Sequence, residues 1–315
     1  MSPARRSNPY GRAMSESLSG LRRKIDSAAE LKSVVRTMKA LAASSIGQYE
    51  KAVLSLNDYY RTVQLGLAAC LRQSPAEYLL EKKGDAETGP AGAFIFGSDQ
   101  GLVGPFNDVL AAYAATTLAS KGGKKDVWAI GTRMESCLAD LSLPAVGVLT
   151  VPNSIPAITP LVGRILVEID ARRRKDRLGQ VYIFHHRPKS KATYEPVGQR
   201  LLPLDTTWRA TLADLPWPSQ NLPEVMGGGE ATLSAFLREY LFVSLFRACI
   251  ESLTSENASR LAAMQRAEKN IDELREDLNR TFHRLRQSTI DEELFDVVSG
   301  YESLSSEKGA TRANE

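Results

Sequence analysis

Two proline-free stretches, one near each end of the chain, carry a long helical pattern of apolar positions. The first runs from residue 18 to 71, and its apolar residues recur at steps of three and four: Leu18, Leu21, Ile25, Ala28, Tyr49, Val53, Leu56, Tyr60, Val63, Leu67 and Cys70. The second runs from residue 231 to 301, with the same pattern at Ile271, Leu274, Leu278, Thr281 and Leu285. A mean spacing of about 3.5 residues over many turns is typical of coiled coils. Because each helix alone would expose its apolar side to water, we predict that the two form one antiparallel coiled coil.

Between these helices the pattern changes to short apolar runs that alternate with helical segments. We predict strands at residues 91–97, 126–131, 146–151 and 180–185, and helices at residues 106–119, up to 140, and 158–174. Strands that alternate with helices are typical of a small, largely parallel sheet. The predicted fold class is therefore α/β, a Rossmann-like domain inserted into a long coiled coil. Residues 196–223, which are rich in proline, are expected to form an edge strand and an irregular return connection.

Breaks in the pattern divide the chain into five segments. We predict a disordered tail over residues 1–14, the first coiled-coil helix over 15–74, the inserted domain over 90–226, the second coiled-coil helix over 230–302 and a disordered tail over 303–315. Pro75 and the polar run 81–90 end the first helix, and Gly227–Gly229 form a joint before the second. The first segment is rich in Arg and Ser and has no acidic residue, so a transit peptide is its alternative interpretation.

Composition excludes several classes of protein. Forty basic and thirty-seven acidic residues give a net charge of +3, which gives no indication of nucleic-acid binding. The three cysteines, Cys70, Cys137 and Cys249, are far apart and odd in number, so neither a disulfide framework nor a zinc cluster is indicated. No apolar run reaches the roughly 18 residues of a membrane span.

One glycine-rich turn stands where a phosphate-binding loop would be found, between a predicted strand and a predicted helix. It reads Gly97-Ser-Asp-Gln-Gly-Leu-Val-Gly104, and its spacing fits neither the dinucleotide fingerprint nor the P-loop. We therefore interpret it as a structural turn in which Ser98 and Asp99 bind local backbone amides. A nucleotide site is the less favoured alternative.

The other reactive side chains do not form a catalytic pattern. His185 and His186 are adjacent at the end of a predicted strand and point to opposite faces, so they cannot readily share a metal. We expect no catalytic residue, cofactor or metal. The basic cluster at residues 172–177 is interpreted as a solvated helix end, with polyanion or lipid binding as the alternative.

Several separated motifs, taken together, resemble the gamma subunits of rotary F-type ATP synthases. They occur in the family's order at residues 21–25, 37–44, 97–104 with Asn107, 251–260 and 286–294. The terminal helices carry most of the resemblance, whereas the inserted domain agrees in pattern and in its glycine turn. The resemblance implies a non-catalytic central-stalk rotor that couples ion flow across the membrane to ATP synthesis or hydrolysis in the beta subunits.

The resemblance also implies partners and contact residues. The coiled coil would be enclosed by the alpha and beta subunits, and the α/β domain would lie near the epsilon subunit and the membrane c-ring. Met38, with Lys39 beside it, matches the position that faces the acidic loop of the beta subunit. Arg286 and Gln287 match the pair that contacts the beta catch loop, and two further coupling positions match Arg260 and Glu293. The implied location is peripheral, on the cytoplasmic face of the bacterial inner membrane.

The helical pattern around Gln287 agrees with an outward-facing role. The expected apolar seam of this region runs through Leu278, Thr281, Leu285 and Ser288, and Gln287 lies about 100° from the last of these positions. We therefore expect the Gln287 side chain to point away from the partner helix.

Two departures from the family pattern mark this chain. It has Ser45 where the family usually has lysine and Asp291 where the family usually has threonine. We interpret them as marks of a divergent branch, such as the alternate ATPase that accompanies the main enzyme in some bacteria. The alternative functions are a free-standing coiled-coil adaptor with an α/β binding module and, less favoured, a nucleotide-dependent enzyme.

Overall fold

The computed structural model describes residues 17–73, 90–174, 178–189, 193–204, 206–219, 221, 224–225 and 229–312. The described residues up to Met38, together with those from Gln265 on, form one compact unit, and Lys39–Met264 contain the other. Helices α1 (Leu18–Gln73) and α6 (Gly229–Arg312) contribute to both units. Each unit is described by itself below.

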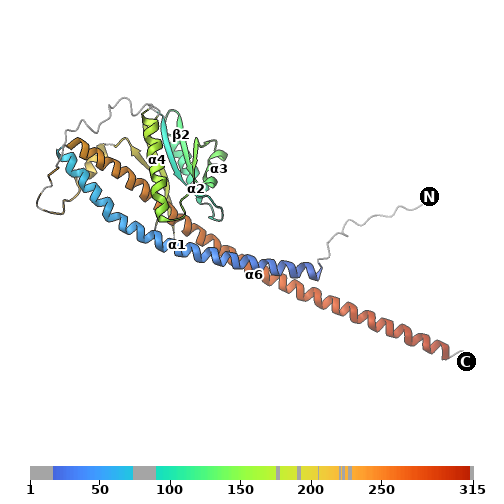
Figure 1. Ribbon diagram of the computed structural model, residues 1–315. Coiled ribbons are helices and arrows are strands. Elements are labelled where there is room, and N and C mark those ends of the chain that lie inside the picture. The colour runs from blue at the N-terminus through green and yellow to red at the C-terminus, as the bar shows by residue number, and fades with distance from the viewer. Residues whose placement is uncertain are drawn as a thin grey trace, which may run out of the picture. The chain divides into compact units, whose positions relative to one another are not determined.

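The unit formed by Lys39–Met264 contains a five-stranded sheet (Figure 1). The strands lie in the order β3-β2-β1-β4-β5. Their bounds are β1 (Ala91–Phe96), β2 (Lys125–Ile130), β3 (Gly147–Leu149), β4 (Gln180–Pro188) and β5 (Tyr194–Leu202). All neighbouring pairs are parallel except β4 and β5, which are antiparallel. The predicted parallel α/β sheet with an edge strand is confirmed.

Helices cover both faces of this sheet (Figure 1). Alternate residues of β1 separate the two cores, because successive strand side chains point to opposite faces. Ala93 and Ile95 pack with α2 (Phe106–Ala119) and α3 (Thr132–Asp140) on one face. Phe94 and Phe96 pack on the other face with α4 (Ile158–Arg173), which follows the short 3-10 helix η2 (Ile155–Ala157), and with the middle of α6.

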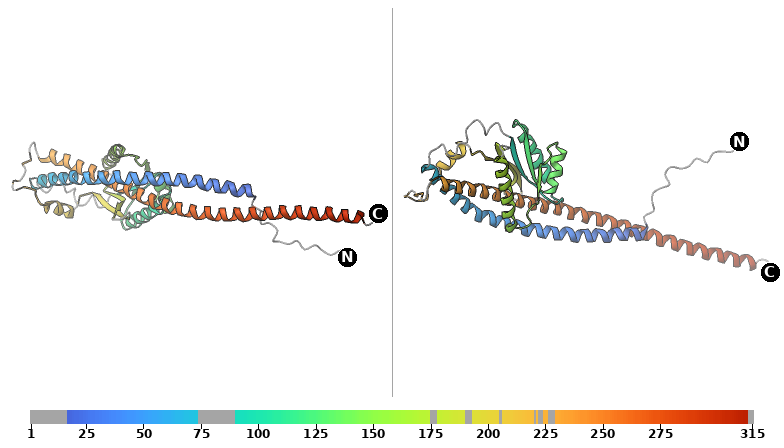
Figure 2. Two further views of the ribbon diagram at one scale, coloured as in Figure 1. Left: turned by 90° about the horizontal axis from the view of Figure 1, so that it is seen from below. Right: turned by 45° about the horizontal axis from the view of Figure 1, so that its top comes forward.

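In the same unit, α1 and α6 run antiparallel, side by side (Figure 2). Tyr59 donates a hydrogen bond to Glu239 at 2.7 Å, and the Tyr60 and Tyr240 rings lie 5.9 Å apart. A third apolar cluster joins these helices to α5 (Thr206–Ala213) through Val63, Leu67, Leu212, Leu233 and Val243. At Gly66, an added Cβ would lie 2.3 Å from the ring of Phe236, so glycine allows the close approach here.

In the other unit, two ion pairs set the register between α1 and α6. Lys32 pairs with Asp272, and Arg36 Nε lies 2.9 Å from Glu268 Oε1. From the first pair to the second, the position advances by four residues on α1 and goes back by four residues on α6. The antiparallel pairing is therefore confirmed in this unit. Leu21 and Ala28 are buried, in agreement with the predicted seam of α1.

Several predicted boundaries are wrong. Residues 206–213 form α5 in a region expected to be irregular, because the prolines there flank this helix rather than interrupt it. α6 continues to Arg312 instead of ending at residue 302, and no proline interrupts it there. β3 is shorter than predicted, and β4 extends through His185 and His186 to Pro188 because β5 pairs with it over that length.

The predicted seam of α6 is also wrong at two positions. Leu274 is 51% exposed, and Ser288 is exposed as well, whereas Leu278, Thr281 and Leu285 are half-buried. The predicted tail 1–14, the helix-ending Pro75, the polar run at 81–89 and Gly227–Gly228 lie outside the described residues.

Candidate functional site

The glycine turn after β1 is held by side chains from its own ends and from neighbouring turns. Asn107 Oδ1 accepts from the Ser98 amide at 3.0 Å, and its Nδ2 donates to Ser98 Oγ at 2.8 Å. The Asp99 carboxylate accepts from the amides of Thr132 at 3.1 Å and Val151 at 2.9 Å. The structural interpretation of the turn holds, but Asp99 binds amides beyond β2 and β3 rather than local ones. It thereby ties three strand ends together.

Two glycines make this arrangement possible. A Cβ at Gly97 would lie 2.4 Å from Met134 Cβ, so α3 can pack against the end of β1 only at a glycine. Gly131 has a φ of 109°, and a Cβ there would lie 2.4 Å from the backbone oxygen of Ser98. Gly131 therefore combines a left-handed conformation with a close backbone crossing, and both favour glycine.

Helix α6 occupies the edge of the sheet where α/β proteins of this type bind ligands. The strand order reverses between β1 and β4, and such switch points normally form a ligand crevice at the carboxyl ends of the strands. Here Ser252 Oγ donates to the Phe96 carbonyl at 2.9 Å. Ser255 Oγ lies 3.2 Å from the His186 carbonyl and 2.8 Å from the Glu251 carbonyl of its own helix, and it shares its one proton between them. Ser259 Oγ binds the Val103 carbonyl in the glycine turn. The crevice is thus filled by the protein's own helix.

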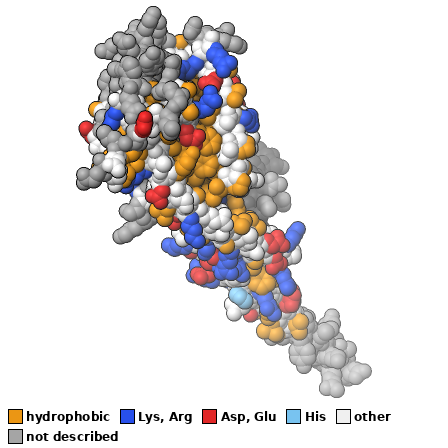
Figure 3. All heavy atoms as spheres, turned by 60° about the vertical axis from the view of Figure 1, so that its left-hand side comes forward, with side chains coloured by type: hydrophobic (Ala, Val, Ile, Leu, Met, Phe, Trp, Pro, Cys, Tyr) orange, Lys and Arg blue, Asp and Glu red, His pale blue; other side chains and the backbone are white. Residues whose placement is uncertain are grey.

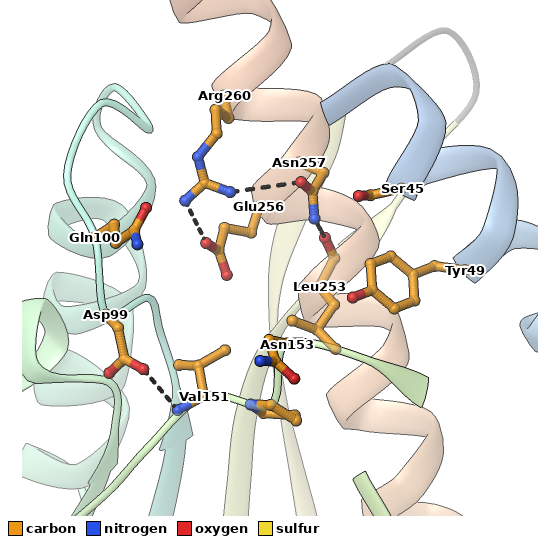
Figure 4. Close-up of a pocket in the computed structure, with 11 residues that line it drawn as sticks. Ser45, Tyr49, Asp99, Gln100, Val151, Asn153, Leu253, Glu256, Asn257 and Arg260 are labelled. Atoms are coloured by element: carbon orange, nitrogen blue, oxygen red, sulfur yellow. Dashed lines mark hydrogen bonds and ion pairs between the residues drawn. The ribbon is translucent and has the colours of Figure 1, made fainter. Parts of the chain in front are cut away.

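A polar cavity of about 220 Å³ remains beside this contact (Figure 4). Its lining comes from α1, the glycine turn, the segment after β3 and α6, and includes Ser45, Tyr49, Asp99, Gln100, Asn153, Glu256, Asn257 and Arg260. Arg260 Nη2 donates to Glu256 Oε1 at 2.6 Å, and Glu256 Oε2 has no partner in the described part of the chain. Burial raises the pKa of Glu256; the Arg260 charge opposes this rise, and Asp99 adds to it.

The two adjacent histidines have separate structural partners. His185 Nε2 lies 2.8 Å from Glu251 Oε2 of α6, and His186 Nε2 lies 2.8 Å from the Phe106 carbonyl on the opposite face. Burial lowers the pKa of His186 to about 4, so its imidazole is neutral at pH 7 and donates to that carbonyl. The prediction that the two rings point to opposite faces is confirmed.

Glu251 is the centre of a buried charge cluster that the sequence did not reveal. Its carboxylate accepts from His185 and also from the Nε atoms of Arg187 at 3.3 Å and Arg247 at 2.7 Å. Burial raises the pKa of Glu251, but the hydrogen bonds and charges of His185 and Arg247 outweigh burial and hold it at about 2. The only signal in the sequence was a carboxylate at Glu251 four residues after Arg247 on a mostly apolar helical face.

The basic cluster at the end of α4 is used in part for packing. Arg172 bonds Glu168 through Nε at 2.9 Å and Asp126 through Nη1 at 3.1 Å. Its guanidinium also lies 5.3 Å from the centre of the Trp128 ring. Residues 175–177 of this cluster lie outside the described residues.

The six predicted contact residues are divided between the two units. Lys39 and Arg260 belong to the unit with the sheet, and only Arg260 lines the polar cavity. Met38 is half-buried in the other unit, while Arg286, Gln287 and Glu293 are exposed on α6. The exposure of Gln287 agrees with the helical-wheel expectation, but the predicted contacts of these residues stay predictions.

Exposed apolar side chains surround the last of these positions. At the register of the two ion pairs, Leu18, the first residue of α1, lies level with Arg286. Beyond that level no described part of α1 lies opposite α6, and the apolar side chains there are between 48% and 74% exposed: Ile290, Leu294, Phe295, Val297 and Val298. Figure 3 shows hydrophobic side chains at this surface, next to the grey end of the chain. Clustered exposure of this kind marks an interaction surface.

The described residues also contain neither a membrane span nor a metal site. None of the described helices combines the length and the apolar character needed to cross a membrane. Among the same residues, no three His, Cys, Asp or Glu side chains converge as a metal site would require.

Three solved structures of rotor chains are similar to this one. A chain of the Euglena gracilis mitochondrial ATP synthase (OSCP/F1/c-ring, rotational state 3) has 14% identity and a TM-score of 0.62, covering 92% of this chain and 95% of that chain. A rotor chain of the same enzyme in rotational state 1 has 15% identity and a TM-score of 0.54, covering 87% and 98%. A central stalk/c-ring chain of the Tetrahymena thermophila mitochondrial ATP synthase has 19% identity and a TM-score of 0.54, covering 74% and 99%.

At these identities the solved structures establish a shared fold, and a family model carries the assignment further. The model described as ATP synthase matches residues 17–304, which is most of the chain. Its match includes both terminal helices, the sheet and the exposed apolar segment of α6. The chain therefore belongs to the family of F-type ATP synthase gamma subunits.

Proposed function

We propose that this chain is the central-stalk rotor of an F-type ATP synthase or ATPase, and that it carries no active site of its own. Family membership supports the assignment. The observation that carries it is the exposed apolar end of α6, which extends past the level at which α1 begins. A shaft that turns inside a ring of other subunits needs such a surface, because the ring provides its second wall.

The enclosing partners in this proposal are the alpha and beta subunits. Six residues would contact them or act in coupling in different rotational states: Met38, Lys39, Arg260, Arg286, Gln287 and Glu293. Contacts that differ between states shift the affinity of each beta subunit for nucleotide, since a conformational change is driven only by differential interaction energy. ATP chemistry would therefore belong to the beta subunits, and this chain would couple it to ion flow.

The α/β unit is proposed to face the epsilon subunit and the c-ring, as the gamma family implies. The Euglena and Tetrahymena structures, which contain c-rings, support a complex of this kind. In this arrangement the chain is a peripheral membrane protein, on the cytoplasmic face of the inner membrane in a bacterial cell. The α6 contact over the glycine turn supports a non-catalytic role, because it fills the crevice in which a nucleotide would be bound.

The mass of the intact complex tests this proposal. The chain is isolated from its host under native conditions through an affinity tag on its N-terminus, and the complex is weighed whole. We expect one copy of this chain with three alpha and three beta chains. A symmetric dimer of this chain without alpha and beta chains would contradict the rotor and support the coiled-coil adaptor.

A further inference from the structure

A second cavity, of about 390 Å³, lies within the Lys39–Met264 unit between the sheet and the terminal helices. Its polar lining comes from three strand residues and four helix residues: His185 and Arg187 of β4, Gln199 of β5, Tyr60 of α1, and Ser244, Arg247 and Glu251 of α6. Neither the rotor proposal nor the fold requires a cavity at this place. The lining of this cavity is more basic than that of the cavity beside Arg260, because it contains two arginines.

The secondary structure explains why these side chains converge. His185 and Arg187 are two residues apart on β4, so both point to the same face of the sheet. Gln199 lies opposite Ile183 in the antiparallel pair and therefore shares that face. Arg247 and Glu251 are four residues apart on α6 and lie on one side of the helix.

Glu251 fixes the orientation of both guanidinium groups. Its side chain is 4% exposed and accepts one Nε–H from each arginine, from Arg187 at 3.3 Å and from Arg247 at 2.7 Å. The Arg247 guanidinium also lies 5.5 Å from the centre of the Tyr60 ring, which restrains its plane. Both arginines are thus held before any ligand arrives, which lowers the entropy cost of binding.

The two arginines keep most of their hydrogen-bonding capacity free. Each uses only Nε, so all four Nη groups have no partner in the described part of the chain. The side chains are 45% and 35% exposed, which leaves these groups open to solvent. His185 is 2% exposed and bonds Glu251 through Nε2, while its Nδ1 also has no described partner.

The charges around the cavity leave an excess of positive charge. Arg187 and Arg247 face the single carboxylate of Glu251. Glu195 lies opposite Arg187 on β5, but Lys189 pairs with it at 2.5 Å. A buried carboxylate between two guanidiniums therefore presents a net positive, donor-rich surface to the solvent side of the cavity.

We propose that this cavity is a binding site for a phosphate-type oxyanion, held by the Nη groups of Arg187 and Arg247. Each guanidinium fork can donate to two oxygens, and two forks together match the four oxygens of a tetrahedral phosphate better than the two of a carboxylate. Gln199 lies on the same face and supplies an amide donor. The ligand is either free phosphate or the phosphoryl group of a small ester.

Titration of the purified full chain with inorganic phosphate by calorimetry tests the site, with sodium acetate and sodium chloride at matched ionic strength as comparisons. We expect saturable binding of phosphate and none of acetate or chloride. Arg187→Gln should weaken binding at least about tenfold, because charge-assisted hydrogen bonds are lost. Arg164→Gln, a change at an exposed arginine of α4 outside this cavity, should leave the affinity within about twofold.

Arg187→Gln is preferred to a change at Arg247, because Arg187 is the more exposed of the two and its loss is less harmful to folding. Thermal unfolding in the same buffers provides a second measurement: phosphate should raise the Tm of the unsubstituted chain and not that of Arg187→Gln. Competition by glycerol phosphate would identify a phosphoryl ester as an acceptable ligand, and its absence would identify the free ion. Unsaturable binding, equal binding of acetate, or an affinity unchanged by Arg187→Gln would overturn the proposal.

Discussion

Two segments of the same helix, α6, show opposite relations between polarity and burial. Between Glu251 and Ser259 the helix buries polar side chains, and all of Glu251, Ser252, Thr254, Ser255, Glu256, Asn257 and Ser259 are buried. Between Ile290 and Val298 it exposes apolar ones. The middle segment bonds most of its polar groups within this chain, whereas the apolar side chains of the end segment have no described partner in it. The comparison separates residues that maintain the fold from residues that serve assembly.

The largest effect is expected at the buried carboxylate of the middle segment. Glu251→Gln removes the charge that His185, Arg187 and Arg247 share. We expect the free energy of unfolding to fall by about 3 kcal/mol, the low end of the range for a broken buried ion pair, since both guanidiniums keep part of their hydration. Chemical denaturation of the purified chain measures this. Glu293→Gln, at an exposed position of the same helix, is the matched control and should leave the free energy of unfolding unchanged. Equal losses of stability in the two variants would contradict the difference between the middle and end segments of α6.

Acid should act next, through His186. Its pKa is about 4 in the folded chain and about 6.5 when unfolded, so the unfolded chain binds the proton first as the pH falls. Stability is therefore full above pH 6.5 and is lost between pH 6.5 and 4, by about 2 kcal/mol at pH 5. Glu251 adds a further loss between pH 4.5 and 2, since folding lowers its pKa to about 2.

Thermal unfolding from pH 8 to 4.5 measures this dependence. His186→Gln keeps a donor for the Phe106 carbonyl but does not titrate. The variant should start less stable and then lose less on acidification than the unsubstituted chain. A parallel decline in both proteins would show that another group controls the acid response.

A smaller effect is expected at Ser255, which contacts a backbone carbonyl of β4. Ser255→Ala removes the hydroxyl that the His186 carbonyl shares with the Glu251 carbonyl, and leaves both buried oxygens without this side-chain donor. We expect a loss of about 1 kcal/mol. Ser234→Ala, at an exposed position of α6, is the control and should change stability by less than about 0.5 kcal/mol. Both are compared by denaturation midpoints, and a neutral Ser255→Ala would mean that the serine only fills space.

The smallest effect on stability is expected at Gln287, in the end segment. Gln287→Ala removes an exposed side chain and should alter the free energy of unfolding by no more than about 0.5 kcal/mol. If the rotor proposal holds, the same change weakens the coupling of ATP turnover to ion pumping, because a hydrogen bond to the ring of roughly 0.5–1.5 kcal/mol is lost. ATP-driven pumping and Tm are both measured on the assembled complex.

Gln265→Ala changes an exposed glutamine earlier on α6 and provides the control for general effects of the substitution. It should pump normally. Normal pumping with a lowered Tm in Gln287→Ala would assign Gln287 to packing and would remove it from the set of contact residues.

The sequence predicted those features that depend on local pattern. The spacing of apolar residues by three and four positions located the buried side of α1, including Leu21 and Ala28. An amphipathic helix buries its one apolar side against any partner. The pattern was wrong at Leu274. The side of α6 that packs against α1 depends on the register between the two helices, and this register cannot be derived from the sequence of either helix alone. The ion pairs of Lys32 and Arg36 reveal it only in the structure.

The contacts around the glycine turn could not be predicted for the same reason. The turn was placed correctly between β1 and α2, because glycines and a strand end are local signals. The helix that covers it is more than 150 residues away in sequence, as the pair Ser252 and Phe96 shows. Serines inside a helix usually indicate only solvent or tight packing. Their role here becomes visible once the carbonyls at the strand ends are placed opposite them.

Those serine hydroxyls have a mechanical consequence. Ser252, Ser255 and Ser259 each contact a different backbone carbonyl outside the helix: one at the end of β1, one within β4 and one in the glycine turn. Helix α6 cannot turn about its own long axis within this unit without breaking these three contacts at once, together with the bonds of Glu251 to His185 and Arg187 of β4. A torque applied to the helix is therefore passed to the backbone of the sheet, which is stiff, rather than being absorbed by slippage of one side chain past another.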